Sequence, residues 1–551
     1  MREIHRPQRV LIVGGGTAGW VTASFLRRSA PDVEITLIES AGIPTVGVGE
    51  ATLQGIRQML RYVGIDEAEF ITDCDASFKL GIRFSGWNPD RDFYHPFGAV
   101  TGPSVLVNDW LRNTARGSQV PIDDTLDQGL GRIAEAGLAP QSAGWAPYTG
   151  DLRTYAYHLD AARLADLLKR HAIKNGVTHV LDDVTGVDVL PNGWISQVRT
   201  AGHGALGADL FFDCTGFRGR LINEALGEPF EPFSQQLWCD RAVALNVPTP
   251  DADQAALRPY TRSTTRSAGW IWEIPLYSRS GNGYVYSSAY QSPEEAEAEL
   301  RAYLGRGDDI PARHLSMRVG KCRRVWVGNC IAVGLAGGFI EPLESTGIGF
   351  IQDIGEWFVY LSPDLSWDDE SAARMNAYID GEYDFTRDFV ACHYLTAGRD
   401  DTPFWRDLHR DPSVRTAGID DVLDQWHRGS LDGLRPKDGS RPQFTRYSWA
   451  YVIGGNGYRP ERAADARIDA DELAHAKADL AASTAAVAEV AGQLPGNRQR
   501  VRELRDAWRR GERPAFAADP DAYAGRPHQV AGYLSDGSRS VVGARNPAPA
   551  G

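Results

Sequence analysis

The sequence predicts an α/β fold built around a strand–helix–strand unit at its N-terminus, and three observations carry this prediction. Residues 9–13 (RVLIV) form a short apolar run of the kind that is buried in a parallel sheet. From Trp20 to Arg28 the apolar side chains have helical spacing, and residues 33–39 (VEITLIE) indicate a second strand. A glycine-rich turn joins the first strand to the helix, which completes a βαβ unit.

Length and charge limit the architecture and the partners. A chain of 551 residues is long enough for two to four compact units or one large composite. It carries 58 basic and 72 acidic residues and a net charge of −14, which argues against nucleic acid or an anionic membrane as the main partner. The 6 cysteines are scattered without a C-x-x-C pair, which indicates reduced thiols in a cytoplasmic protein without a metal site.

The uncharged stretch 10–26 follows a basic start, so a signal peptide must be considered. Three consecutive glycines interrupt this stretch and no small-residue cleavage site closes it, so a strand, loop and helix fit it better. No other stretch approaches the length needed to span a membrane. We therefore expect a soluble, cytoplasmic protein.

Later segments add strands and helices to the same sheet. Residues 155–175 predict an amphipathic helix that ends at Gly176, and strand-like runs follow at 184–189 and 210–214. An apolar run at 325–340 leads into a predicted helix from about Ser345 to Leu361, and residues 462–494 have a helical composition. The insertions between these segments are expected to build a second, substrate-facing layer.

The turn after the first strand carries a dinucleotide fingerprint. Residues 14–19 (GGGTAG) match G-x-G-x-x-G between a strand and a helix. In this pattern Gly14 permits the tight turn, Gly16 lets a pyrophosphate approach the backbone, and Gly19 lets the helix pack closely. The spacing therefore predicts a Rossmann-like dinucleotide site.

The helix that follows supplies the phosphate site, and the second strand supplies the acid. Thr17 and Ala18 lie in the first turn, where free N–H groups and the positive end of the helix dipole attract phosphate. Glu39 ends the second strand, 20 residues after Gly19, where its carboxylate can accept hydrogen bonds from ribose hydroxyls. The chain has no second G-x-G-x-x-G, so no separate site for a nicotinamide cofactor is evident.

Several further motifs resemble the tryptophan halogenase family of flavin-dependent halogenases. The hexapeptide 270–275 (WIWEIP) has that family's W-x-W-x-I-P pattern, and residues 43–52 (IPTVGVGEAT) resemble its flavin strap, although a plain glycine-bearing loop is the alternative. Other matching strings are DCTGF at 213–217, CDRA at 239–242, GNGYVY at 281–286, GLAGGFIEPLESTGI at 334–348, HY at 393–394 and TPFW at 402–405. In order and spacing the resemblance covers about residues 8–460.

The resemblance implies an FAD-binding, Rossmann-like flavin monooxygenase fold with an intertwined, largely helical substrate module. We expect one composite unit over residues 1–531 and a Gly/Ser/Pro-rich tail over 532–551. Within that unit the FAD module would comprise about 8–75, 150–225 and 318–365, and the substrate module 76–149, 226–317 and 366–531.

The resemblance also assigns the catalytic residues. Lys79, which in an average protein would be a solvated surface charge, takes the position of the family's active lysine and receives hypohalous acid, by hydrogen bonding it or as a chloramine. Glu344 takes the position of the assisting glutamate, which stabilises the cationic ring and takes or relays its proton; a carboxylate that stabilises a helix N-terminus is the alternative. Thr346 and Gly347 would bind the halide.

The remaining site residues are carried over from the family with less specificity. Ala51, Val184, Leu335 and Ile348 are expected flavin contacts. The aromatic substrate would stack on His95 and Phe97, where a packed loop is the alternative, with Trp449 as the opposite face. Trp270 and Trp272 carry no acid, base or nucleophile, so we expect them to form a wall that keeps the substrate from the flavin path.

The function that the resemblance implies is chlorination or bromination of an indole-type or other electron-rich arene. FADH2 would come from a separate NAD(P)H-dependent flavin reductase, with O2 and halide as co-substrates, and a homodimer is possible. The tyrosines around residue 450 do not match the family's clamp for free tryptophan residue by residue, so indole derivatives and other arenes stay open. A flavin monooxygenase that inserts oxygen is the main alternative, and a non-catalytic FAD-binding protein is another.

Overall fold

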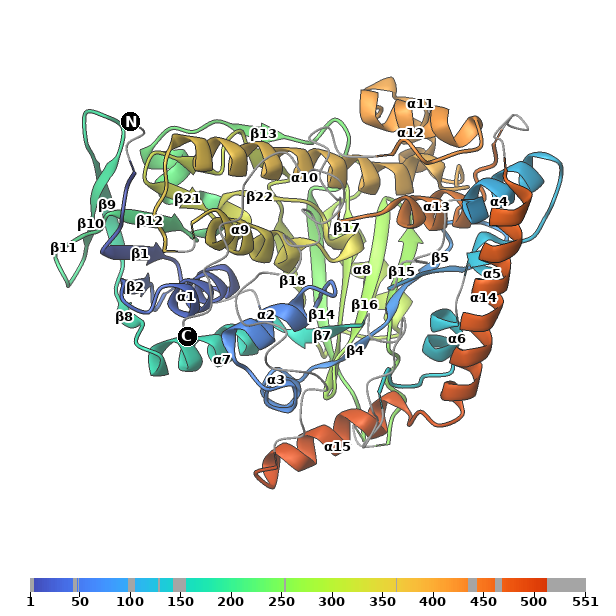
Figure 1. Cartoon of the computed structure of the whole chain (residues 1–551), viewed down its shortest axis with the longest axis horizontal. Helices are drawn as coiled ribbons and strands as arrows, with labels where there is room; N and C mark the ends of the chain where they lie inside the picture. The colour runs from blue at the N-terminus through green and yellow to red at the C-terminus, as the bar shows by residue number, and fades with distance from the viewer. Residues whose placement is uncertain are drawn as a thin grey trace, which may run out of the picture.

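A six-stranded, mainly parallel sheet forms one half of the molecule in the computed structural model (Figure 1). The structure describes residues 4–42, 47, 49–97, 105–126, 129–141, 155–251, 254–362, 364–434, 443–460 and 468–512. The predicted tail at 532–551 and residues 43–46 and 48 of the expected strap at 43–52 lie outside these residues. Within the described ranges, no helix is long and apolar enough to cross a membrane.

The N-terminal βαβ unit forms the centre of this sheet, as predicted. The strands, in spatial order, are β20 (Trp326–Val327), β21 (Cys330–Ala332), β12 (Leu210–Asp213), β1 (Arg9–Val13), β2 (Glu34–Glu39) and β8 (Thr178–Leu181). Alternation along β1 sends Val10 and Ile12 into the core beneath the helices, whereas Leu11 and Val13 face a cluster on the other side. Both faces of β1 are therefore buried, which explains its continuous apolar sequence.

Helices cover one face of this sheet and a small antiparallel sheet covers the other. The helices around α1 (Thr17–Ser29) are α7 (Ala161–Lys174), α9 (Gly347–Leu361) and α2 (Ile56–Val63). The small sheet consists of β9 (Val184–Val189), β10 (Ile195–Thr200) and β11 (Ala205–Gly207). The chain returns to the first sheet with β8, β12 and β21, as predicted for 210–214 and for the run that begins at 325, whereas residues 184–189 pair in the small sheet instead.

A seven-stranded sheet forms the other half of the molecule. Its order is β18 (Arg313–Ser316), β14 (Arg241–Pro248), β17 (Arg279–Tyr286), β16 (Gly269–Pro275), β15 (Thr261–Arg266), β5 (Gly81–Ser85) and β6 (Phe93–Pro96). Only β15 and β5 are paired in parallel. The hexapeptide at 270–275 is therefore an inner strand, hydrogen-bonded on both sides.

Two further small sheets lie between the large ones. They consist of β3 (Gly49–Ala51), β7 (Ala156–Asp160) and β4 (Ser77–Lys79), and of β13 (Phe230–Pro232), β19 (Gly320–Cys322) and β22 (Gly338–Phe339). The first corrects one prediction, because residues 156–160 are a strand and not the start of the helix expected over 155–175. The Asp160 carboxylate accepts from the N–H groups of Ala162 and Arg163, so it caps a helix that begins at Ala161.

The remaining helices surround the second sheet. The long helix α10 (Asp369–Thr396) runs along both halves of the molecule (Figure 1). The others are α3 (Glu67–Asp73), α4 (Val105–Ala115), α5 (Ile122–Leu126), α6 (Leu130–Glu135), α8 (Pro293–Leu304), α11 (Pro403–Arg410), α12 (Ala417–His427), α13 (Arg446–Gly455), α14 (Ala470–Ala491) and α15 (Asn497–Arg509). Helix α14 lies within the predicted helical segment 462–494.

Candidate functional site

The glycine loop between β1 and α1 has the geometry that a dinucleotide needs. Gly14 has a φ of +113°, and a Cβ there would lie 2.1 Å from the Cys214 carbonyl oxygen. A Cβ on Gly19 would lie 1.9 Å from the Gly14 carbonyl oxygen. In contrast, a Cβ on Gly16 would meet nothing within 4 Å in the described structure. Gly14 and Gly19 are thus required by the fold itself, whereas Gly16 leaves open space for a ligand.

The groups around this loop fit FAD. No side chain caps α1, so the N–H groups in the turn of Thr17 and Ala18 remain for a phosphate. The Glu39 carboxylate lies against Gly15, and it accepts from Lys169 Nζ at 2.6 Å and His179 Nε2 at 2.8 Å. These two donors fix the carboxylate at the edge of the loop, where a ribose would lie.

Two of the other expected flavin contacts, Leu335 and Val184, follow residues that contact the loop helix or the second strand. Leu335 follows Gly334, whose Cβ would lie 2.8 Å from the Ala18 side chain. Val184 begins β9, two residues after Asp182, which donates its N–H to the Glu39 carbonyl. Ala51 and Ile348 lie further along the chain, in β3 and in the first turn of α9.

Replacing Gly16 with alanine should weaken FAD binding by roughly tenfold or more, because a methyl group would occupy the space left for the pyrophosphate. Folding should be unchanged, since that methyl group meets no protein atom within 4 Å. The dissociation constant can be measured from quenching of FAD fluorescence. Gly496→Ala is the matched control, because its Cβ also meets nothing within 4 Å. Unchanged affinity in Gly16→Ala would show that the pyrophosphate does not bind here.

Lys79 is fully buried at the junction of the two halves of the molecule. It ends β4, and its Nζ donates to the Thr52 carbonyl at 3.1 Å and to Ser345 Oγ at 2.9 Å. The Phe97 ring centroid lies 4.6 Å from Nζ. Burial lowers the pKa of Lys79 to about 7, although the Glu344 charge opposes this shift. The amine can therefore exist in both protonation states near neutral pH.

Glu344 is buried between two histidines. His95 Nδ1 lies 3.1 Å from Oε1, and His393 Nε2 lies 2.8 Å from the same oxygen. Burial raises the pKa of Glu344, but the charge and hydrogen bonds of His95 and His393 outweigh burial and lower it to about 2. Glu344 is therefore a carboxylate at neutral pH.

His393 makes a hydrogen bond through each of its ring nitrogens. Its Nδ1 lies 2.8 Å from the Phe389 carbonyl oxygen, which only accepts, so Nδ1 is the donor of that bond. Its Nε2 lies 2.8 Å from Oε1 of Glu344. In the sequence His393 is only part of the HY string at 393–394, and helix α10 places it beside Glu344.

The turn after Glu344 leads into a candidate anion site. Ser345 has a φ of +64°, which is uncommon for a residue with a side chain and reverses the chain between Glu344 and α9. Thr346 precedes the helix, and its buried Oγ1 has no hydrogen-bond partner in the described part of the chain. A Cβ on Gly347 would meet nothing within 4 Å there. Open space and an unsatisfied hydroxyl at a helix N-terminus fit a bound halide.

Aromatic rings line the space beside Glu344. The His95 ring lies 6.2 Å from the Phe389 ring, which lies 5.0 Å from Trp449 and 4.3 Å from Phe444 (centroid distances). Trp449 is fully buried, and its Nε1 has no partner among the described residues. The structure thus connects His95 and Trp449 through Phe389, a residue that the sequence analysis did not select.

The two tryptophans of the hexapeptide lie in β16 and differ in their contacts. Trp270 Nε1 donates to Glu341 Oε1 at 3.0 Å. Trp272 Nε1 is buried without a hydrogen-bond partner in the described structure, and the Trp272 ring covers Gly283, whose Cβ would lie 2.1 Å from it. The ring centroids are 6.3 Å apart.

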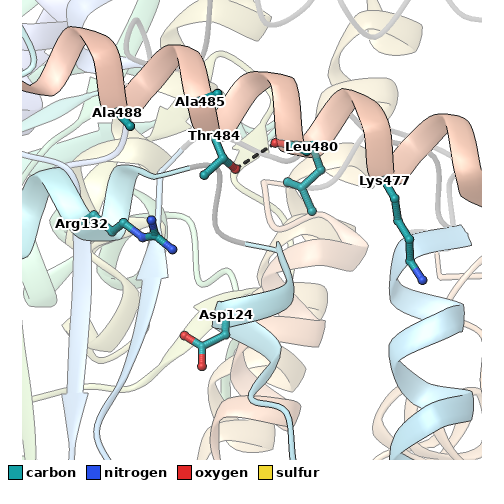
Figure 2. A pocket seen from close by; sticks show the side chains of 8 residues that line it. Asp124, Arg132, Lys477, Leu480, Thr484, Ala485 and Ala488 are labelled. Atoms are coloured by element: carbon teal, nitrogen blue, oxygen red, sulfur yellow. Dashed lines mark hydrogen bonds between the residues drawn. The ribbon is translucent and has the colours of Figure 1, made fainter.

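A separate groove of about 410 Å³ lies between α14 and the short helices α5 and α6 (Figure 2). No predicted site residue lines it. Two of its polar groups are used within the protein, because Lys477 pairs with Asp109 at 2.8 Å and the Thr484 hydroxyl donates to the Leu480 carbonyl at 2.8 Å. The remaining wall consists of Asp124, Arg132, Leu480 and three alanines.

The chain is similar to known tryptophan halogenases both in sequence and in structure. The family model described as tryptophan halogenase matches residues 9–472. The tryptophan 6-halogenase SttH of Streptomyces toxytricini is 41% identical over 493 residues, which are 83% of this chain and 92% of that protein. The tryptophan 7-halogenase RebH of Lentzea aerocolonigenes is 39% identical and covers 76% of this chain and 82% of its own length. A crystal structure of a tryptophan halogenase from Shewanella frigidimarina superposes with a TM-score of 0.83 at 31% identity and covers 91% and 98% of the two chains.

Proposed function

This chain belongs to the tryptophan halogenase family and is a flavin-dependent halogenase, and from that premise we propose that it halogenates an indole-type or other electron-rich arene beside Lys79. The observation that carries the proposal is the buried pair of opposite charges. Lys79 and Glu344 are both fully enclosed, yet neither is neutralised by a direct ion pair with the other. The buried Lys79 charge, which has no carboxylate partner among the described residues, is costly for stability, and such a group is characteristic of a reaction site.

The reagent is formed on the flavin side of this pair. The chemistry that reduced FAD supplies when bound is the activation of O2, through which chloride or bromide is oxidised to hypohalous acid. Thr346 and Gly347 would hold the halide at the N-terminus of α9. A separate NAD(P)H-dependent reductase would supply the reduced flavin.

Lys79 would then hold the hypohalous acid at the arene. As an ammonium it donates a hydrogen bond to the oxygen of HOX, which makes the halogen more electrophilic. Because burial lowers the pKa of Lys79 to about 7 and the Glu344 charge only partly opposes this shift, the neutral amine is also present, so a chloramine is the second form in which Lys79 would hold the halogen. The arene would stack against His95, Phe97 and Trp449.

Glu344 would act on the cationic ring that forms when halogen adds. A carboxylate with a pKa of about 2 is ionised at every pH near neutral, so it stabilises that cation by charge. It is a weak base, yet a protonated arene is strongly acidic, so the ring proton can still pass to it. His95 and His393 hold the carboxylate in place during both events.

The proposal is tested by supplying a flavin reductase, NADH, FAD, O2 and either bromide or chloride, and by offering tryptophan, indole derivatives and phenols. We expect products in which one ring hydrogen is replaced by halogen, detected by mass and isotope pattern. The relatives named above are tryptophan halogenases, so tryptophan belongs in the panel as one candidate among several. Products that gain oxygen instead would favour the flavin monooxygenase alternative.

A further inference from the structure

Strand β16, which carries the hexapeptide, is attached at both of its ends to residues beside the proposed catalytic pair. Near one end, Trp270 Nε1 donates to Glu341, which lies three residues before Glu344. At the other end, the Pro275 carbonyl accepts from Ser77 Oγ at 2.6 Å, two residues before Lys79.

The Glu341 end is fixed from two directions. Glu341 is fully buried, and its Oε1 accepts both from Trp270 and from the Tyr394 hydroxyl. Tyr394 follows His393 on α10, so consecutive residues of that helix hold Glu341 and Glu344. Between the two acids the chain forms a single tight turn, Pro342–Glu344. A displacement of Glu341 would therefore move Glu344 through this turn.

The Ser77 end is fixed by the neighbouring strands. Ser77 lies in β4, which pairs with β7 and ends at Lys79. His158 of β7 lies 3.3 Å from Ser77 Oγ through Nδ1 and 2.9 Å from Thr261 Oγ1 through Nε2. Thr261 belongs to β15, the neighbour of β16 in the large sheet. The strand that presents Lys79 is thus joined to the sheet that contains β16.

We propose that β16 is a strut that fixes the distance between Lys79 and Glu344, with Trp270 and Glu341 as positioning residues. The inference rests on the proposed roles of Lys79 and Glu344. An inner strand with hydrogen bonds on both sides is among the stiffest parts of a sheet, so it is suited to hold two groups at a set separation. A shift of well under 1 Å between the two charges would lower the rate of the chemical step.

The two tryptophans of the hexapeptide make the proposal testable, because only one of them serves the strut. Trp270→Phe removes the hydrogen bond to Glu341, whereas Trp272→Phe removes no hydrogen bond between described residues. We expect Trp270→Phe to lower kcat by roughly tenfold with little change in KM for the arene. Trp272→Phe should lower kcat by less. If both tryptophans instead form a wall between the substrate and the flavin, the two variants should lower kcat to a similar extent, and both should release oxygenated products.

A second pair of variants tests the Glu341 end without touching β16. Glu341→Gln keeps an amide oxygen that can accept from Trp270 and Tyr394, and Glu341→Ala leaves both donors unsatisfied. We expect the glutamine variant to retain most of the kcat that the alanine variant loses. The double variant Trp270→Phe/Glu341→Ala should be no slower than the slower single variant, because both remove one connection.

The strut and the proposed function fail in different ways. If Lys79→Met still halogenates, the proposed role of Lys79 falls and the strut falls with it, whereas a wild type that adds oxygen instead of halogen would overturn the proposed function. If Lys79→Met is inactive but Trp270→Phe is as fast as Trp272→Phe, the function stands and the strut is overturned. Equal loss of kcat in Glu341→Gln and Glu341→Ala would also overturn the strut, because catalysis would then depend on the ionisable carboxyl group of Glu341 and not on a hydrogen-bond acceptor at that position. Circular dichroism and FAD affinity confirm that each variant is folded.

Discussion

Replacing Lys79 with methionine is expected to lower the rate of halogenation by roughly 10³-fold or more, while the consumption of NADH by reductase and flavin continues. Methionine has a similar length and fills the site, but it offers no donor to the hypohalous acid. Product formation and NADH oxidation, followed in the same reaction, separate these two effects. If the variant halogenates at an appreciable rate, Lys79 is not the catalytic residue.

The same substitution should raise stability. Because burial lowers the pKa of Lys79 from its ordinary value of 10.5 to about 7, the unfolded chain binds more protons than the folded chain between these pH values, so wild-type stability rises with pH across this window. The cost of the buried charge is greatest below pH 7 and fades towards pH 10.5. Lys79→Met removes that cost, so it should stabilise the protein by up to a few kcal/mol at pH 6 and little at pH 10.

Lys321 provides the matched control for both effects. It is also buried, but its Nζ donates to Asp380 and to Asp384, the latter at 2.8 Å, so its charge is compensated. Lys321→Met should lower the free energy of unfolding, because Asp380 loses the Lys321 cation and Asp384 keeps only Arg387. The opposite signs can be read from urea unfolding at pH 6. A destabilised Lys79→Met would mean that the charge of Lys79 is compensated in the folded protein.

The parts of the fold that the sequence predicted are those fixed by local patterns. The glycine loop, β1 and α1 form one continuous segment, in which Gly19 packs against the Gly14 carbonyl five residues earlier. The error at residues 155–175 has a local cause too. Apolar and aromatic residues at 155–159 fit the helical period, but β7 pairs with both β3 and β4, and the Asp160 cap starts the helix only at Ala161. Pairing with distant strands therefore determined the structure of residues 156–160, because the spacing of their side chains alone does not separate a helix from a strand.

The site residues also divide into those that a local string identifies and those that only the fold brings together. Lys79, Glu344 and Thr346 were identified through the resemblance, because each lies in a string of matching residues. The groups that hold them come from distant parts of the chain, such as His393 for Glu344 and the Thr52 carbonyl for Lys79. Nothing in the sequence around Glu341 shows that it accepts from Trp270, since 71 residues separate the two. Such pairs are created by the packing of β16 and α10 against the turn at Pro342–Glu344.

Glu344→Gln is the second variant with a large expected effect, and kcat should fall by at least about 10²-fold. The amide has the shape of the carboxylate but no charge, so it cannot stabilise the cationic ring or take its proton. KM for the arene should change little, because the aromatic rings and not Glu344 hold the flat substrate. Steady-state kinetics with saturating halide and reduced flavin measure both constants. A variant with unchanged kcat would assign the carboxylate to structure alone.

The histidines give this prediction a dependence on pH. Glu344 must be ionised, so activity is lost as pH falls through its pKa, which His95 and His393 hold at about 2. The wild type should therefore show no acidic loss of kcat from this group above about pH 4. His393→Gln keeps a neutral donor near Oε1 but removes the charge of His393, which adds to the larger effect of His95 in lowering the pKa of Glu344, so the acidic loss of kcat should move upward. An unchanged acidic profile in His393→Gln would show that His393 does not hold Glu344 in its ionised state.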